Sequence, residues 1–322
     1  MRVLLVKTSS MGDVLHSLPA LTDAQQAIPS IQFDWAVEEG FAQIPTWHSA
    51  VNQVIPVAIR RWRKNWFSAP IRAERAAFRQ QLQATHYDAV IDAQGLLKSA
   101  FLVTRLAHGD KHGYDRHSIR EPLASFFYDH RYSISKQQHA VERIRQLFAK
   151  SLGYACPSEQ GDYAIARHFL QLSENVQSPY VVFLHSTTRD DKHWPEENWR
   201  QLITLMANKG AKIKLPWGTP HEQQRAQRLA KGFDFVEVLP KLTLAEVAQQ
   251  LAGAKAVVSV DTGLSHLTAA LDKPNFTLFG PTDPGLIGGY GQEQHVIKST
   301  INSMASIKAD DVYQQLAHVD LM

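Results

Sequence analysis

The chain has 322 residues, of which 44% are hydrophobic and 20% charged. This length predicts about two domains with cores that need no cross-links, and the composition excludes disordered and fibrous proteins. The only cysteine, Cys156, excludes an internal disulfide and a Cys-rich zinc site. Lys and Arg exceed Asp and Glu by 34 to 31, an excess too small to indicate a nucleic-acid partner.

The positive charge is concentrated in the first half. Residues 1–155 hold 19 Lys and Arg against 13 Asp and Glu, whereas residues 156–322 hold 15 against 18. We therefore expect the first half to contact an anionic ligand. No stretch approaches the roughly 18 apolar residues of a membrane span, and the N-terminus lacks a signal-peptide core, which predicts a cytoplasmic protein.

Short, β-branched apolar runs alternate with helix-length amphipathic segments. In the first half the pattern predicts strands at Val3–Val6, Phe33–Val37, Val51–Val57 and Ala89–Asp92, and helices near Val14–Gln26, Ile71–Ala84, Leu96–Leu106 and Ala140–Leu152. In the second half it predicts strands at Tyr180–Leu184, Lys212–Leu215, Phe235–Val238, Ala256–Val260 and Phe276–Phe279, and helices near Glu196–Asn208, Pro220–Lys231, Leu244–Ala252 and Thr262–Leu271. This alternation is typical of an α/β protein with doubly wound parallel sheets.

The alternation weakens between Tyr154 and Pro179, a polar stretch with several Pro and Gly residues. We predict an N-terminal Rossmann-like domain over 1–155, a linker over 156–179 and a C-terminal Rossmann-like domain over 180–322. The last helix is expected to pack back on the N-terminal domain. Ligands of such folds bind at the carboxyl ends of the strands, so a site is expected in a central cleft.

The first candidate site is the loop after the first strand, residues 7–13, KTSSMGD. It has one glycine, so it lacks the nicotinamide or flavin fingerprint, and no P-loop occurs in the chain. Small residues permit close backbone approach before Asp13, which is interpreted either as a helix cap or as a general base. His16 would share a helix face with it.

Four loops after strands of the second half carry further polar residues. Residues 259–266, SVDTGLSH, suit phosphate binding at a helix start, and residues 280–284, GPTDP, follow the next strand. Residues 185–195, HSTTRDDKHWP, place hydroxyls and Lys192 where a diphosphate would lie. In residues 216–222, PWGTPHE, Glu222 either holds ribose hydroxyls or caps a helix, and Trp217 is interpreted as packing. Capped helices and solvated charged loops are the structural alternatives.

A basic segment with interleaved aromatics, residues 60–67, RRWRKNWF, follows the third strand. It suits an anionic lipid surface, a phosphorylated ligand or nucleic acid, and a solvated helix face is the alternative. Arg120, Lys136 and His139 are expected to extend the same surface.

Together these motifs resemble the bacterial ADP-heptose:lipopolysaccharide heptosyltransferases. The resemblance rests on residues 7–16 (KTSSMGDVLH), 189–195 (RDDKHWP), 260–266 (VDTGLSH) and 280–284 (GPTDP), and residues 60–64 look like the heptosyltransferase I branch. It extends to about Ser299. It implies a GT-B fold and inverting, metal-independent transfer of L-glycero-D-manno-heptose from ADP-heptose to the Kdo of Kdo2-lipid A, with no cofactor. The enzyme would lie on the cytoplasmic face of the inner membrane as a peripheral protein.

The resemblance also implies roles for individual residues. Asp13 would be the base and Lys192 would bind the diphosphate. The donor would contact Thr187, Thr188, Lys192, Glu222, Asp261, Thr262, Gly263, Leu264 and His266. The acceptor would contact Ser10, Gly12, Arg60, Arg61, Arg63, Lys64, Arg120 and His139. Heptosyltransferase II or a related core glycosyltransferase is the alternative within the family. A non-catalytic binder of anionic lipid or nucleic acid leaves Asp13 and Lys192 unexplained, and the missing glycine fingerprint argues against a nicotinamide oxidoreductase.

Overall fold

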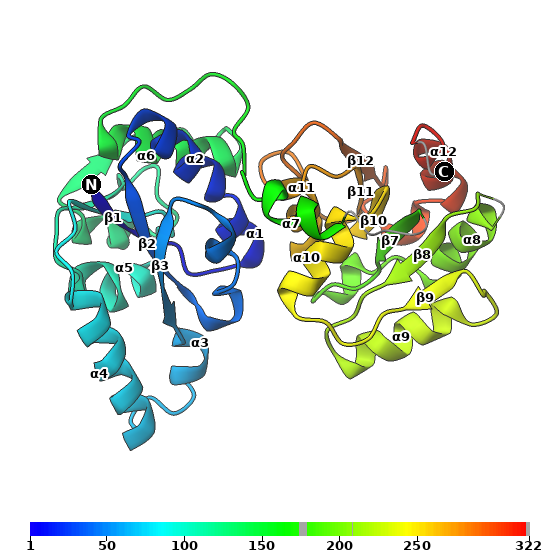
Figure 1. Ribbon diagram of the computed structural model, residues 1–322, viewed down its shortest axis with the longest axis horizontal. Coiled ribbons are helices and arrows are strands. Elements are labelled where there is room, and N and C mark those ends of the chain that lie inside the picture. The colour runs from blue at the N-terminus through cyan, green and yellow to red at the C-terminus, as the bar shows by residue number, and fades with distance from the viewer. Residues whose placement is uncertain (174–178, 208, 320–322) are drawn as a thin grey trace. The chain divides into compact units, whose positions relative to one another are not determined.

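The computed structural model describes residues 1–173, 179–207 and 209–319, with side chains omitted for 170–173. The chain forms two compact units, Met1–Ala164 and Ile165–Met322 (Figure 1). The division falls inside the stretch 156–179 that the sequence marks as a linker. Residues 174–178 of that stretch and Asn208, at the end of one predicted helix, lie outside the described residues.

The first unit is built on a sheet of six parallel strands in the order β3-β2-β1-β4-β5-β6. Its strands are β1 (Arg2–Val6), β2 (Gln32–Glu38), β3 (Val51–Val57), β4 (Ala89–Asp92), β5 (Lys111–Tyr114) and β6 (His130–Tyr132). Its helices are α1 (Met11–Leu15), α2 (Leu18–Ala27), α3 (Ile59–Trp62), α4 (Ala69–Gln83), α5 (Leu97–Leu102) and α6 (Ala140–Leu152), with 3-10 turns that include η3 (Thr104–Leu106) and η4 (Pro122–Phe127).

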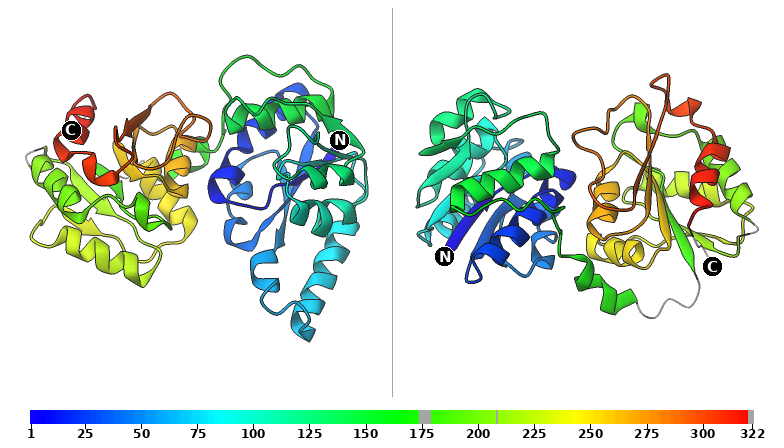
Figure 2. Two further views of the ribbon diagram at one scale, coloured as in Figure 1. Left: turned by 180° about the vertical axis from the view of Figure 1, so that it is seen from behind. Right: turned by 90° about the horizontal axis from the view of Figure 1, so that it is seen from above.

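Both faces of this sheet are covered because successive side chains of a strand point to opposite faces. Leu4 and Val6 belong to a core shared with Ile71 and Phe78 of α4. Phe33, which pairs with Val3 in register, contacts the Phe148 ring of α6 at 5.7 Å between centroids. Helices α2 and α6 lie side by side (Figures 1 and 2).

The second unit is again a sheet of parallel strands, in the order β12-β11-β10-β7-β8-β9. It repeats the strand order of the first unit, because its first and fourth strands along the chain, β7 and β10, are neighbours as β1 and β4 are. Its strands are β7 (Tyr180–Leu184), β8 (Lys212–Leu215), β9 (Val236–Val238), β10 (Ala256–Val260), β11 (Asn275–Phe279) and β12 (Gln294–Lys298). Its helices are α7 (Ala166–Ser173), α8 (Glu196–Met206), α9 (Pro220–Ala230), α10 (Leu244–Ala252), α11 (Gly263–Ala270) and α12 (Ala309–Leu316).

One core cluster of this unit lies between the sheet and α8, α9 and α12. Phe183 and Trp199 pack together there, and Trp194 and Asn198 both donate hydrogen bonds to the Ile307 carbonyl just before α12. Helix α12 therefore contacts α8 of its own unit (Figure 1). The expectation that the last helix returns to the N-terminal domain stays a prediction.

Two predicted helices are wrong as single elements. The segment Val14–Gln26 is split into α1 and α2, because Pro19 cannot donate to the carbonyl of Leu15 and would clash with it. The segment Leu96–Leu106 is split at Val103 into α5 and η3. The prediction of two Rossmann-like parallel sheets is confirmed. None of the helices in the described ranges combines the length and the hydrophobicity of a membrane span.

Candidate functional site

The candidate site of the first unit lies where β1 and β4 are neighbours. The chain leaves these two strands toward opposite edges of the sheet, so the loops that follow them separate and leave a crevice at their carboxyl ends. The side chain of Gln94, just after β4, fastens the loop after β1. Its Oε1 accepts hydrogen bonds from Thr8 N at 2.8 Å, Ser9 N at 2.9 Å and Thr8 Oγ1 at 3.1 Å.

Asp13 projects from this loop at the start of α1. Its Oδ2 accepts hydrogen bonds from the Ser10 amide at 3.0 Å and the Ser10 hydroxyl at 3.1 Å, so Asp13 is part of a capping box. Lys7 Nζ lies 3.6 Å from Oδ1. The side chain nevertheless keeps 44% of its surface exposed. The cap and the general base, which the sequence left as alternatives, are thus compatible in one carboxylate.

The charge state of Asp13 follows from its surroundings. Burial alone would raise the pKa of the carboxyl, but the Lys7 ammonium and the hydrogen bonds from Ser10 outweigh it and hold the pKa below its usual value. Asp13 is therefore an ionised carboxylate at neutral pH, able to accept a proton. Lys7 is itself held by a 2.9 Å hydrogen bond to the Ala93 carbonyl.

A pocket of about 870 Å³ opens beside Asp13. Its polar wall is formed by Ser9, Ser10, Asp13, Gln94, Lys98, Arg120 and Glu121, and its apolar wall by Leu96, Leu97, Phe101 and Leu102. A ligand with hydroxyls, negative charge and an apolar part would match these walls.

The predicted acceptor residues divide into three groups. Ser10 and Arg120 line the pocket, and Gly12 is buried in α1 beside Asp13. His139 caps α6 and contacts the ring of the buried His16 at 5.3 Å between centroids. The basic residues Arg60, Arg61, Arg63 and Lys64 are exposed on and after α3, and none of them lines this pocket.

The basic segment is anchored by its aromatic residues. Trp62 is buried against Phe78, and Arg75 stacks on Trp66 at 3.4 Å from the ring centroid. Arg61 is bound by the carboxylates of both Glu39 and Glu74. Arg60, Arg63 and Lys64 are therefore better placed than Arg61 to contact an anionic ligand.

The equivalent strand switch point of the second unit lies between β7 and β10. Lys192 Nζ lies 2.6 Å from Asp261 Oδ2, and both side chains are more than four-fifths buried. Thr282 Oγ1 donates to the same carboxylate oxygen at 2.9 Å, and Thr187 Oγ1 donates to the Asp261 carbonyl at 3.0 Å. The structure thus brings together three loops that the sequence treats separately.

The other predicted donor residues lie on the segments that follow β7, β8 and β10. Thr262 is the N-cap of α11 and Gly263 its first residue, followed by Leu264 and His266, and all four are half-buried. Thr188 is exposed. Glu222 accepts hydrogen bonds from the amides of Gly218 and Thr219 and so caps α9.

Several residues of these sites were given no role of their own from the sequence, although Lys7 and Thr282 lie in loops that the sequence marks as candidate sites. Gln94, Lys98 and Glu121 line the pocket, and Lys7 and Thr282 contact the two central carboxylates. Gln94 and Thr282 follow strands that the sequence does predict, so their place at a strand end was the available signal. Lys98 and Glu121 carry no such signal, because α5 and η4 bring them to the pocket through tertiary packing.

Comparison with known proteins agrees with this arrangement. The model of glycosyltransferase family 9 (heptosyltransferase) matches residues 75–317. Lipopolysaccharide heptosyltransferase 1 of Salmonella typhimurium is 71% identical over 98% of this chain and 100% of its own. The structure of E. coli heptosyltransferase WaaC with ADP has a TM-score of 0.97 at 70% identity, covering 98% of this chain and 99% of that one. The WaaC structure with ADP-2-deoxy-2-fluoro heptose has a TM-score of 0.95 at 68% identity over the same shares.

Two Rossmann-like units, each with a polar cluster at its strand switch point, define a glycosyltransferase with a GT-B-like fold. The chain belongs to glycosyltransferase family 9, the heptosyltransferases. The predicted family is therefore confirmed. The sequence left heptosyltransferases I and II open, and these high-identity relatives are of the heptosyltransferase 1 branch.

Proposed function

We propose that this enzyme transfers L-glycero-D-manno-heptose from ADP-heptose to the Kdo of Kdo2-lipid A in lipopolysaccharide core assembly, with inversion and without a metal ion. The observation that carries the proposal is the ionised, half-exposed carboxylate of Asp13 in a pocket of about 870 Å³. The names of the relatives and the ADP and ADP-heptose-analogue complexes of WaaC support the donor and the lipopolysaccharide substrate.

In this mechanism Asp13 takes the proton from the acceptor hydroxyl of Kdo. The hydroxyl oxygen attacks the anomeric carbon of heptose, the bond from that carbon to the diphosphate breaks, and ADP leaves with the electron pair. A single displacement of this kind inverts the anomeric centre. Lys7 keeps Asp13 ionised and Ser10 fixes its orientation, so the base is formed before the acceptor binds.

The second unit would neutralise the departing diphosphate. Lys192 supplies a cation, Thr187 and Thr188 supply hydroxyls, and free N–H groups at the start of α11 supply partial positive charge. Lys192 is paired with Asp261, and a diphosphate bound by Lys192 would leave the Asp261 carboxylate to accept hydrogen bonds from the heptose hydroxyls. Glu222 would contact the ribose from the start of α9. We also propose that the site lies in the central cleft expected from the sequence.

The acceptor is polyanionic, and the first unit would hold it. Arg120 faces the Asp13 pocket directly, and Arg60, Arg63 and Lys64 offer further cations. Peripheral contact with the anionic inner membrane surface would follow from an acceptor embedded in that membrane. We propose no cofactor.

The experiment uses purified protein, ADP-heptose and two acceptors: Kdo2-lipid A, and the same lipid already carrying one heptose. Transfer to the first acceptor, with the opposite anomeric configuration in the NMR spectrum of the product, is the expected result. Transfer only to the second acceptor would identify a heptosyltransferase II, and retained configuration would exclude the single displacement.

A further inference from the structure

Four large hydrophobic side chains of the first unit are exposed on two adjacent elements. Leu97 and Phe101 lie on α5, and Leu123 and Phe126 lie on η4, with Leu123 62% and Phe126 73% exposed. The two elements pack together, and the rings of Phe101 and Phe127 meet edge to face at 6.1 Å between centroids. We refer to these four residues as the α5–η4 ridge. An apolar cluster exposed in this way marks an interaction surface.

Cations flank the ridge. The segments 97–105 and 120–131 contain Lys98, Arg105, Arg120 and Arg131, against two acids. Arg105 lies over the Phe101 ring at 3.6 Å from its centroid, and Arg131 lies 6.0 Å from that of Phe126. The two acids, Glu121 and Asp129, accept backbone hydrogen bonds from Leu97 and Lys111. The flanking cations therefore outnumber the acids, and the acids have backbone donors of their own.

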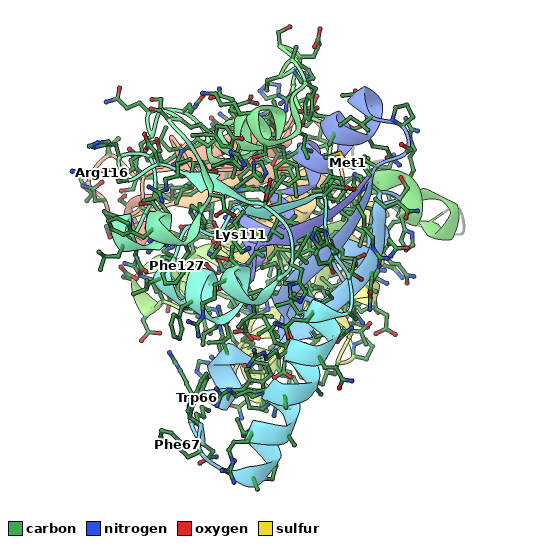
Figure 3. The ribbon with its side chains drawn as sticks, turned by 90° about the vertical axis from the view of Figure 1, so that its left-hand side faces the viewer. Met1, Trp66, Phe67, Lys111, Arg116 and Phe127 are labelled. Atoms are coloured by element: carbon green, nitrogen blue, oxygen red, sulfur yellow. The ribbon has the colours of Figure 1, made fainter. Side chains whose placement is uncertain are left out.

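The ridge is continuous with the pocket that contains Asp13. Leu97 and Phe101 line that pocket, and so do Lys98 and Arg120. A surface that rested against the ridge would therefore lie at the mouth of the pocket. Figure 3 shows this side of the unit, with Phe127 of η4 well apart from Trp66 and Phe67 of the basic segment.

We propose that the α5–η4 ridge docks this enzyme on an anionic lipid bilayer, with Leu123 and Phe126 inserted among the acyl chains and the flanking cations on lipid phosphates. Apolar side chains beside Lys and Arg are the combination that binds the interface of an anionic membrane. The inference rests on the proposed function in one respect: a lipid-borne acceptor would then enter the pocket from the bilayer surface.

The charges favour a bilayer over a second copy of the chain. A symmetric dimer would place the same patch against itself and so bring the four cations against their equivalents. Lipid phosphates instead supply the opposite charge over the whole patch. The ridge is a different surface from the basic segment at residues 60–67, which also suits an anionic surface by its sequence.

The test measures partition of the full chain onto sedimenting vesicles. The vesicles contain phosphatidylcholine alone or with about 30% phosphatidylglycerol, which gives them the negative surface charge of an anionic membrane. The variant is Leu123→Ser/Phe126→Ser, and the matched controls are Ile301→Ser, exposed in the second unit, and Phe67→Ser in the basic segment. We expect the double variant to lose at least about tenfold in partition onto anionic vesicles. Both controls should bind as the wild type does, and added salt should weaken wild-type binding.

Kinetics separate this inference from the proposed function. The double variant should transfer heptose to a deacylated, water-soluble acceptor at the wild-type rate, and its KM should rise only for the acceptor in vesicles. Loss of binding in Phe67→Ser with none in the double variant would overturn the inference. So would a wild-type dimer that the double variant dissociates while vesicle binding persists. If the wild type transfers no heptose to either acceptor, the proposed function fails, and the vesicle measurement still decides the inference.

Discussion

Asp13 combines two roles that its position makes compatible. One carboxylate oxygen completes a capping box with Ser10, and the other lies near Lys7 while the side chain remains accessible from the pocket. Sequence alone could place this carboxylate at a strand end and suggest both roles. It could not show that Lys7, buried six residues earlier, determines the charge of Asp13, because that depends on where the lysine side chain is held.

Replacing the base should abolish most of the turnover. Asp13→Asn keeps a hydrogen-bond acceptor for Ser10 and removes the proton acceptor, so kcat should fall by about 100- to 10,000-fold. ADP affinity, measured by calorimetry, should be unchanged because the proposed donor residues lie in the second unit. Asp110→Asn, an exposed acid, serves as the control. Near-wild-type kcat in Asp13→Asn would refute the assigned role.

The pH dependence of kcat tests the contribution of Lys7. Since the pKa of Asp13 is held below its usual value, the base stays ionised, and its activity is lost only as the pH falls through that lowered pKa. Lys7→Met removes the cation and leaves the effect of burial, so the acid limb of the kcat profile should move to higher pH. Lys98→Met, in the same pocket, should leave the limb in place. An unchanged limb in Lys7→Met would show that Lys7 does not control this pKa.

Lys192 is the cation that binds Asp261 in the second unit, and we propose that it binds the donor diphosphate. Its substitution by Met should lower kcat by about 100- to 1,000-fold, the usual effect of removing one group that stabilises a developing anion. The stability of the protein should fall as well, because Asp261 would lose a partner at 2.6 Å in a mostly buried position. Steady-state kinetics with varied ADP-heptose measures the first effect. A kcat within threefold of the wild type would contradict the role in leaving-group stabilisation.

At the scale of elements, periodicity predicts those that are long and apolar. The strands Val51–Val57 and Ala89–Asp92 and the helix Ala140–Leu152 occur with the predicted limits. Strands β5, β6 and β12 were missed because residues such as Lys111, His130 and Gln294 interrupt any apolar run. These strands lie at or next to a sheet edge, and their pairing depends on the neighbouring strands. A pattern within a few residues does not contain that information.

The contact between α2 and α6 depends on a buried ion pair. Arg145 binds Asp23 at 2.6 Å and also the carbonyls of Pro157 and Glu159, which lie in the stretch that follows α6. Arg145→Met leaves a buried carboxylate without its cation, so the free energy of unfolding should fall by about 3–5 kcal/mol in urea titration.

A second variant distinguishes loss of the ion pair from loss of the other contacts of Arg145. Arg145→Met/Asp23→Leu removes both charges and should recover part of that loss, whereas the exposed control Arg116→Met should stay within about 0.5 kcal/mol of the wild type. Arg145 also binds Glu142, so a double variant as unstable as Arg145→Met would show that the lost contacts with Glu142, Pro157 and Glu159, and not the unpaired Asp23, cause the effect.

At the scale of the whole molecule, one strand order occurs twice and serves two chemistries. The switch point of the first unit presents a carboxylate beside an open pocket, and that of the second presents a cation beside a helix start. The strand–helix alternation was enough to predict both sheets and the strand ends at which each cluster lies. It could not predict that Lys192 and Thr282 both bind the Asp261 carboxylate, since these residues come from three loops that only the folded sheet brings together.

The proposed mechanism is tested most directly by release of ADP from ADP-heptose in the presence of Kdo2-lipid A and excess EDTA. We expect full turnover by the wild type and a loss of at least about 100-fold in Asp13→Asn. Turnover that stops with EDTA and returns with a divalent cation, or that persists in Asp13→Asn, would contradict this mechanism.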